Sequence, residues 1–252
     1  MKTTPQTGHL HPISDITRQI SSIFAEMGFE IADGPFIEDQ WYNFDALNVP
    51  KDHPARDMQD TFFVRPQKGE DRDTPQVMRT HTSSVQIRFM EQFVKENRQP
   101  PFKIIVPGKV FRNEATDATH EAQFYQFEGL VVGEEISLAH LKGTLEEFFR
   151  RFYQDDSVEA RFRPGYFPFV EPGVEVDLSC QICDRDGGYC PVCKGIGWRE
   201  VLGAGMVHPN VLRNVGLDPE KYSGFAFGAG IDRLAIMKYN IPDVRLLYTG
   251  DL

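Results

Sequence analysis

The sequence predicts a fold that contains antiparallel strands and helices, and three observations support this prediction. Residues 110–130 form two runs of alternating apolar and polar residues joined by a polar loop, which is typical of an antiparallel hairpin. Residues 14–27 and 137–152 carry apolar residues at helical spacing. Residues 223–239 have the pattern of an apolar strand, a glycine turn and a helix. These local patterns do not fix the order of the strands.

Length, composition and charge limit the class of protein. With 252 residues, 40% of them hydrophobic, the chain can bury a substantial core as one large domain with a small inserted module. No apolar run approaches the roughly 18 residues of a membrane helix, and no signal peptide opens the chain, so we expect a soluble cytoplasmic protein without membrane contact. The net charge of -10 argues against a stand-alone nucleic-acid binder, because the whole molecule would repel a polyanion.

The N-terminal part is predicted to contain a flexible segment and then a helix. Residues 1–12 are polar and contain proline, which leaves residues 13–252 as the folded domain. Ser14 is the predicted N-cap of the helix, and Gly28 ends it. The apolar stripe of this helix is expected to pack in the core.

The next segments are predicted to be irregular until a second helix begins. A strand after Gly28 is interrupted by Gly34 and Pro35, and an extended segment rich in acidic and aromatic residues follows. Residues 65–75 are charged and without period, as in a solvated loop. Thr82 or Ser83 is expected to cap the second helix. A third helix begins after Ser137, with one apolar side that packs in the core: Leu138, Leu141, Leu145, Phe148 and Phe152.

The hairpin carries an unusual set of polar side chains. Residues two apart on a strand share a face, so Arg112 and Glu114 should project together, as should Phe124, Gln126 and Glu128 on the returning strand. In this set, the arginine suits a phosphate, and the aromatic ring with a carboxylate suits a purine. The amide with the other carboxylate suits a small substrate that bears an ammonium group. The alternative is a solvent-facing hairpin with ordinary surface charges.

The same residues carry a family resemblance. The runs FRNE (111–114), DATH (117–120) and FYQFEG (124–129) resemble the second signature of class II aminoacyl-tRNA synthetases, in the form found in the alpha subunit of bacterial phenylalanyl-tRNA synthetase. The resemblance extends from about Gly8 to the end of the chain. It implies an α+β fold, with an antiparallel sheet of about six or seven strands flanked by helices and a small four-cysteine knuckle as an insert.

The resemblance also implies a phenylalanine site. His81 and Ser83 match residues at a helix start that hold the polar end of the amino acid, although simple capping would also explain them. Phe167 and Phe169 match the walls of the side-chain pocket and are predicted to share one strand face, where two rings are otherwise more often core. The resemblance makes Ala226 the pocket floor, and Gln126 and Glu128 ligands of the ammonium and carboxylate groups.

Two further matches concern the nucleotide. Arg233 falls in the first turn of the last helix, where a guanidinium and the helix N-terminus together favour an anion; with Arg112 it would hold the phosphates of ATP and act in catalysis. Glu114 and Phe124 would bind the base. Glu171 matches a carboxylate linked to Mg²⁺ and is expected to follow Phe169 on the same strand face.

Four cysteines form two C-x-x-C pairs in the insert at residues 178–198. Cys180, Cys183, Cys190 and Cys193 have the spacing of a tetrahedral Zn²⁺ site, whose closed coordination shell indicates a structural role. Free or redox-active thiols are the alternative. The gap of six residues between the pairs is short, which predicts a compact knuckle.

Two positions depart from the family pattern. Asp232 stands where the family usually has Glu, and Asn113 with Glu114 replaces the more usual Arg-Asp or Asn-Asp. Asp is one methylene shorter than Glu, and this difference would affect a detail of metal binding or helix capping more than the activity. Gly203 and Gly205 lie where the backbone is expected to approach another group closely.

The expected function is activation of phenylalanine with ATP and Mg²⁺ and its transfer to tRNA(Phe). The family's alpha subunit pairs with a beta subunit, as an alpha2beta2 heterotetramer, and carries an N-terminal coiled-coil arm that this sequence lacks; the chain is either a trimmed catalytic domain or a short natural form. Three alternatives stay open: a non-catalytic amino-acid-binding or regulatory paralogue, a zinc-knuckle RNA-binding protein, and a class II synthetase of another specificity.

Overall fold

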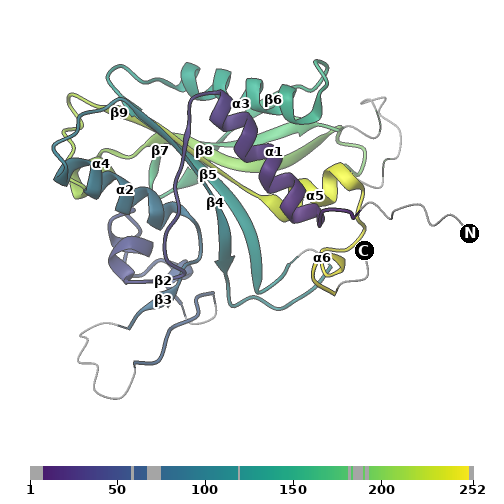
Figure 1. Cartoon of the computed structure of the whole chain (residues 1–252), viewed down its shortest axis with the longest axis horizontal. Helices are drawn as coiled ribbons and strands as arrows, with labels where there is room; N and C mark the ends of the chain where they lie inside the picture. Colours follow the sequence, from purple (N-terminus) through teal and green to yellow (C-terminus); the bar gives the residue numbers. More distant parts are fainter. Residues whose placement is uncertain are drawn as a thin grey trace, which may run out of the picture.

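A seven-stranded sheet forms the centre of the computed structural model, which describes residues 8–57, 60–66, 75–118, 120–180, 183, 190 and 193–249. The strands lie in the order β1-β4-β5-β9-β8-β7-β6 (Figure 1). β1 is parallel to β4, and the other neighbouring pairs are antiparallel, which confirms the expected sheet. The strands are β1 Glu30–Ile31, β4 Phe102–Phe111, β5 Gln123–Gly133, β6 Ala160–Phe167, β7 Val170–Ser179, β8 Trp198–Val207 and β9 Ser223–Gly230.

The predicted hairpin is confirmed as β4 and β5, but its loop is longer than the sequence pattern indicated. The two strands pair as far as Phe111 opposite Gln123. The Arg112 N–H still donates to the Ala122 carbonyl at 2.9 Å, and the chain then leaves the sheet. The prediction that Arg112 and Glu114 share a strand face is therefore wrong, because both lie in the loop after β4.

Three helices cover one face of the sheet. They are α1 Pro12–Glu26, α3 Leu138–Tyr153 and α5 Ile231–Tyr239, and α1 lies between the other two (Figure 1). Phe24 of α1 is fully buried at the centre of this layer, with its ring 4.7 Å from that of Phe148 and 5.4 Å from that of Phe227. The apolar stripes of α1 and α3 are thus core, as predicted.

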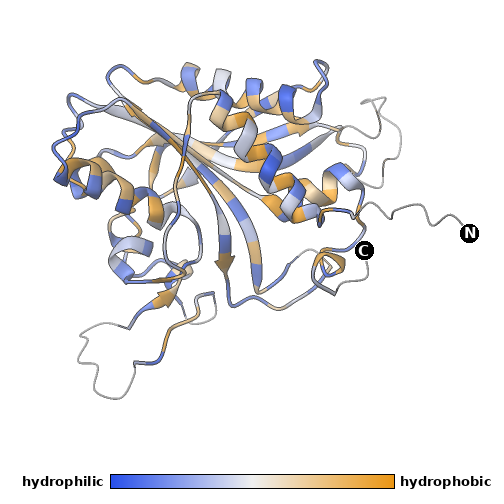
Figure 2. Ribbon diagram, viewed as in Figure 1, coloured by the Kyte–Doolittle hydropathy of each residue, from blue (hydrophilic) through white to orange (hydrophobic). Residues whose placement is uncertain are grey.

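The opposite face carries two α-helices and a π-helix. These are α2 Ser83–Lys95, α4 Pro209–Asn214 and a π-helix at Trp41–Asp45, and Figure 2 shows hydrophobic residues along α2 and α4 interrupted by hydrophilic ones. Ile105 and Val131 point to the first face, whereas Ile104 and Leu130 pack with this second group, as strand alternation requires. A small sheet of β2 Ile37–Glu38 and β3 Val77–Met78, a 3-10 turn at Pro54–Arg56 and α6 Leu246–Thr249 complete the described elements.

One predicted helix start and one predicted core residue need correction. α1 begins at Pro12 and not after Ser14, because His11 is the N-cap and its Nδ1 accepts the Ile13 N–H at 3.2 Å. Ser137 does cap α3, but Leu138 at its first position is 41% exposed and does not belong to the core.

Three other segments were predicted to be extended, looped or flexible. Residues 41–45, expected to be extended, form the π-helix instead. The predicted loop at 65–75 and the flexible segment at 1–12 lie partly outside the described residues. None of the helices in the described part of the chain has the length and hydropathy needed to cross a membrane.

The aromatic layer yields a stability prediction. Phe24→Ala removes a ring that contacts aromatic neighbours from α3 and β9, so urea unfolding should show a loss of about 3–5 kcal/mol. Leu10→Ala is the control, because Leu10 is 52% exposed and its truncation should change the free energy of unfolding by less than about 0.5 kcal/mol. Equal losses in the two variants would contradict this description of the core.

Candidate active site

A cavity of about 390 Å³ opens on the face of the sheet that carries α2 and α4. Its walls come from β5, β8 and β9, from the turn between β6 and β7, from the start of α2 and from the loop after β4. The predicted site residues that line it are His81, Ser83, Arg112, Glu114, Gln126, Glu128, Phe167, Phe169 and Ala226. Residues that are 145 positions apart in the sequence therefore share one cavity.

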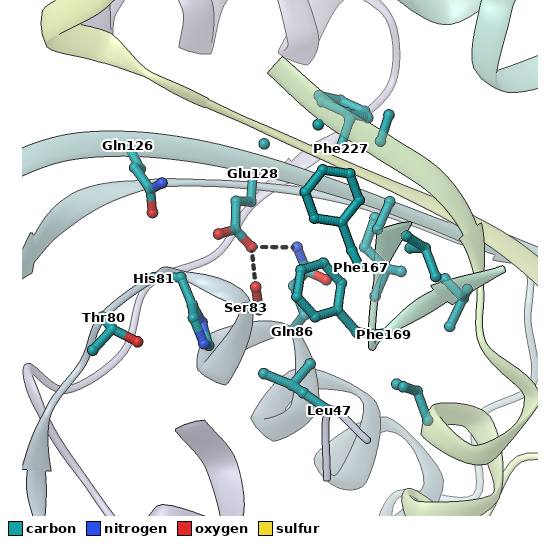
Figure 3. Close-up of a pocket in the computed structure, with 18 of the residues that line it drawn as sticks. Leu47, Thr80, His81, Ser83, Gln86, Gln126, Glu128, Phe167, Phe169 and Phe227 are labelled. Atoms are coloured by element: carbon teal, nitrogen blue, oxygen red, sulfur yellow. Dashed lines mark hydrogen bonds between the residues drawn. The ribbon is translucent and has the colours of Figure 1, made fainter. Parts of the chain in front are cut away.

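Glu128 lies between a polar and an apolar part of the cavity. Figure 3 shows its side chain between Gln126 and His81 on one side and the rings of Phe167 and Phe169 on the other. It stands on β5 opposite Gly228 of β9. A Cβ on Gly228 would lie 2.7 Å from Glu128 Cγ, so glycine is needed there to admit the acid.

The carboxylate of Glu128 accepts three hydrogen bonds at the start of α2. The donors are Ser83 Oγ at 2.5 Å and Gln86 Nε2 at 3.1 Å, both shown in Figure 3, and the Thr82 N–H at 3.2 Å. The free N–H groups at the N-terminus of a helix favour a negative charge, and the two side chains extend this environment. β5 and α2 are thereby joined at one buried acid, which is 7% exposed.

Burial also moves the pKa values of two groups in the cavity. It raises the pKa of Glu128 to about 7, although the hydrogen bonds from Ser83 and Thr82 and the positive charge of Arg112 favour the ionised form. Burial lowers the pKa of His81 to about 4, helped by the nearby charge of Arg112. The His81 Nδ1 atom is buried and has no hydrogen-bond partner among the residues that the structure describes. At neutral pH the imidazole is therefore neutral and the carboxyl group is poised between its two forms.

Arg112 lies at the outer side of the cavity. Its Nε donates to the Thr80 carbonyl at 3.2 Å, its guanidinium lies over the Phe124 ring at 5.1 Å, and its Nη1 is 4.0 Å from Glu114. Burial lowers the pKa of Arg112 from its ordinary value, with Glu114 acting in the opposite direction. Asn43 of the π-helix fixes Thr80 by two hydrogen bonds, at 3.0 and 3.2 Å.

The apolar part of the cavity is a pair of rings. The ring centroids of Phe167 and Phe169 are 6.0 Å apart, and the rings are close to parallel. The prediction that both residues share a strand face is wrong, because β6 ends at Phe167 and Phe169 lies in the two-residue turn before β7. Gly203 is the expected point of close approach, since a Cβ there would lie 2.7 Å from the Phe167 ring. Ala226 of β9 lines the same cavity.

The comparisons with known proteins agree with this geometry. Residues 1–252 match the family model described as "tRNA synthetases class II core domain (F)". The phenylalanine–tRNA ligase alpha subunit of Dehalococcoides mccartyi is 53% identical over 245 residues, which are 97% of this chain and 68% of the relative. Those of Clostridium perfringens and Bacillus mycoides are 52% and 50% identical, and the chain again covers 68% of each. The chain belongs to the phenylalanine–tRNA ligase alpha subunit family.

In this member of the synthetase family, three of the predicted residues do not line the cavity. Phe124 lies next to it, beneath Arg112. Arg233 is exposed in the first turn of α5, whose N-cap Gly230 pairs with Gln126 of β5. Glu171 is 75% exposed in its side chain, and its carboxylate lies 3.3 Å from His208 Nε2.

The position of Glu171 follows from the turn between β6 and β7. Phe169 lies in the turn and Glu171 on β7, whose pairing with β8 is irregular between Val170 and Gly173, so no regular strand runs through both residues. The expectation that Glu171 shares a face with Phe169 is therefore wrong. A carboxylate in this position faces His208 and not the space between Arg112 and the phenylalanine rings.

The four cysteines of this alpha-subunit relative gather at the other end of β7 and β8. Cys180 Sγ and Cys190 Sγ are 3.9 Å apart, Cys183 Sγ and Cys193 Sγ are 3.5 Å apart, and all four sulfurs lie within 4.8 Å of one another. Sulfurs at about 3.8 Å are what a Zn–S bond length of 2.3 Å gives in a tetrahedron. The Gly197 N–H donates to Cys193 Sγ at 3.2 Å.

The structure adds site residues that the sequence did not indicate. Gln86 could have been found, because it follows Ser83 by three positions and so shares its face of α2. Asn43 could not, since it acts from a π-helix where an extended segment was expected. Arg79 is fully buried, and its guanidinium donates to the carbonyls of Lys109 and Gly34.

The raised pKa of Glu128 predicts a pH dependence of stability. A folded-state pKa of about 7 against an unfolded value of 4.5 means that the stability present below pH 4.5 is lost as the pH rises through 7. Glu128→Gln keeps the volume and removes this titration. In urea unfolding at several pH values, the variant should gain up to about 3 kcal/mol relative to wild type between pH 4.5 and pH 8. A difference between the two proteins that is constant with pH would refute the assignment.

Proposed function

We propose that this chain activates phenylalanine with ATP and Mg²⁺ and transfers it to tRNA(Phe), as the catalytic part of an alpha subunit. Family membership supports the reaction class, and the relatives named phenylalanine–tRNA ligase support the amino acid. The observation that carries the proposal is the single cavity in which a buried acid lies beside two parallel phenylalanine rings. An acid and an aromatic slot match the two ends of phenylalanine.

The amino acid would bind with its ammonium group toward Glu128 and Gln126. Both side chains line the cavity, and the ionised form of Glu128 complements a positive charge. His81 and Ser83 would hold the polar end from the start of α2. The benzyl side chain would pack against the rings of Phe167 and Phe169, where offset aromatic contacts add to the gain from burial.

ATP would bind beside the amino acid, over the loop after β4. Arg112 offers a cation that is stacked on Phe124 and anchored to Thr80, and such a rigid guanidinium suits a phosphate group. Glu114 would bind the adenine amino group, and Arg233 would hold the outer phosphates from the first turn of α5.

A magnesium ion would be bound mainly by the phosphates of ATP. Glu171 was the expected protein ligand, but its carboxylate faces His208 outside the cavity, and this geometry argues against a direct role at the reacting phosphate. When bound, Mg²⁺ would neutralise phosphate charge. Arg112 is the positively charged side chain that the protein itself contributes to the nucleotide side of the cavity.

The proposed reaction has two steps and needs no covalent protein nucleophile. An oxygen of the substrate carboxylate attacks the alpha-phosphorus in line, an O–P bond forms, and the bond to pyrophosphate breaks. A hydroxyl of the terminal adenosine of tRNA then attacks the carbonyl carbon and loses its proton, an ester bond forms, and AMP leaves with the electrons of the broken C–O bond. Orientation and fixed charges supply the acceleration, as is general for phosphoryl-type transfers.

The apolar slot sets the selectivity that we expect. Rings and aliphatic side chains line the end of the cavity around Phe167 and Phe169, including Leu130, Val207 and Val211. A slot of this kind rejects the extra hydroxyl of tyrosine only modestly, so editing of tyrosine would take place elsewhere.

The proposal also includes partners, a metal and a location. The alpha-subunit names of the relatives support a beta subunit, and we propose an alpha2beta2 heterotetramer that acts in the cytoplasm. The four-cysteine cluster would hold a structural Zn²⁺, which the sulfur spacing supports. The boundaries 13–252 for the catalytic domain and 178–198 for the knuckle belong to the proposal as well.

The test of the function is ATP–pyrophosphate exchange with each of the twenty amino acids, with and without a beta subunit. We expect exchange with phenylalanine, only modestly weaker exchange with tyrosine, and dependence on the beta subunit. Strong exchange with another amino acid would overturn the specificity. No exchange under any condition would favour a non-catalytic binding protein.

Arg112→Ala should lower the exchange rate by about 10²–10³, because a fixed cation near the reacting phosphate is lost. The Michaelis constant for phenylalanine should change little, since Arg112 lies on the nucleotide side of the cavity. Arg213→Ala is the matched control: Arg213 is an exposed arginine of α4 that contacts Asn210 outside the cavity. An Arg112→Ala protein that exchanges at the wild-type rate would disprove the assigned role.

Removal of the metal should lower stability and spare the chemistry. Elemental analysis should find one zinc per chain, and Cys183→Ser should lose it. The knuckle joins the ends of β7 and β8, because the Cys180 N–H donates to the Gly197 carbonyl at 2.9 Å. The variant should therefore melt at a lower temperature with an unchanged Michaelis constant for phenylalanine. Abolished phenylalanine binding would show that the site is not merely structural.

A further inference from the structure

Asp232 is a buried acid that the reaction itself does not use. It follows the N-cap residue of α5 by two positions and is 5% exposed. One carboxylate oxygen accepts the Tyr125 N–H of β5 at 2.8 Å, and the other accepts the hydroxyl of Tyr248 in α6. A single side chain therefore joins β5, α5 and α6.

The bond to Tyr125 continues the sheet beyond the end of β9. The pairing of β5 with β9 ends at Gln126 opposite Gly230, where the chain turns into α5. The Tyr125 N–H lies one residue further along β5 and would lack an acceptor. The Asp232 carboxylate supplies the acceptor that a longer β9 would have offered, and this fixes the first turn of α5 against β5.

The segment 243–249, which includes α6, also holds the loop 112–122. The Val244 N–H donates to the Ala118 carbonyl at 3.0 Å. Arg245 forms an ion pair with Asp243 and also interacts electrostatically with Asp117 and Glu121, two acids of the loop. The same short segment thus contacts the loop that begins at Arg112 and, through Tyr248, the helical turn that carries Arg233.

We infer that Asp232 and Tyr248 are positioning residues for the nucleotide side of the site. They fix the turn that bears Arg233, and segment 243–249 at the same time fixes the loop that bears Arg112. This inference rests on the proposed function, because it assigns the positioned arginines to ATP. It also gives the aspartate at position 232 a specific role: its two oxygens bridge two donors from different elements.

The alternative is that Asp232 stabilises only the N-terminus of α5. An acid in the first turn of a helix is favourable in any protein. The two roles differ in what the loss of the Tyr248 hydroxyl would do, since that hydroxyl belongs to α6 and not to α5. A purely local role predicts lower stability alone.

The test compares Tyr248→Phe with Tyr239→Phe in complex with the beta subunit. Tyr239 is the matched control, because its hydroxyl also bonds an aspartate, Asp15, but at the far end of α5. In exchange assays, Tyr248→Phe should raise the Michaelis constant for ATP about fivefold, which is the typical effect of one lost hydrogen bond. It should leave that for phenylalanine within about twofold, and Tyr239→Phe should leave both constants within the same limit.

Hydrogen exchange tests the structural part of the inference without a measurement of activity. Hydrogen exchange of the Tyr125 amide should be slow in wild type and become faster in Asp232→Ala, whereas Asp232→Glu should restore protection and the Michaelis constant for ATP. Unchanged constants for ATP in Tyr248→Phe, or equal changes for ATP and phenylalanine, would overturn the inference while wild-type exchange keeps the proposed function intact. Absence of exchange in wild type would instead reject the proposed function, and the inference with it.

Discussion

The structure depends on one buried carboxylate at the junction of a strand and a helix. Glu128 projects from β5 opposite Gly228, which has no side chain and so leaves room for it. Three donors at the start of α2 form hydrogen bonds to its carboxylate. Burial of the charge is unfavourable, and the pKa near 7 reflects this. In spite of this unfavourable term, the acid anchors α2 to the sheet and presents a negative charge in the cavity.

The rest of the site is arranged by close packing around this acid. Gly203 of β8 lets the ring of Phe167 approach the sheet, and the rings of Phe167 and Phe169 lie beside Glu128 (Figure 3). On the other side, Asn43 and Thr80 hold Arg112 at the edge of the cavity. The proposed amino-acid and nucleotide sites are thus adjacent parts of one cavity.

Local sequence patterns predicted much of this architecture. The alternation at 110–130 indicated β4 and β5, the helical stripe indicated α3 with its cap at Ser137, and the family motifs identified nine of the residues that line the cavity. The errors have physical reasons. Strand alternation cannot reveal where pairing stops, so Arg112 and Phe169 were assigned to strands that had already ended. The π-helix at Trp41–Asp45 is stabilised by tertiary contacts such as that between Asn43 and Thr80, which no local pattern encodes.

The central claim is that one cavity recognises both ends of phenylalanine, the ammonium group through Glu128 and the ring through Phe167 and Phe169. Titration calorimetry with phenylalanine, 3-phenylpropionate and alanine tests it most directly, because the second ligand lacks the ammonium group and the third lacks the ring. The account predicts that each loss weakens binding at least about tenfold at pH 8, where Glu128 is ionised. Binding of 3-phenylpropionate as tight as that of phenylalanine would contradict it.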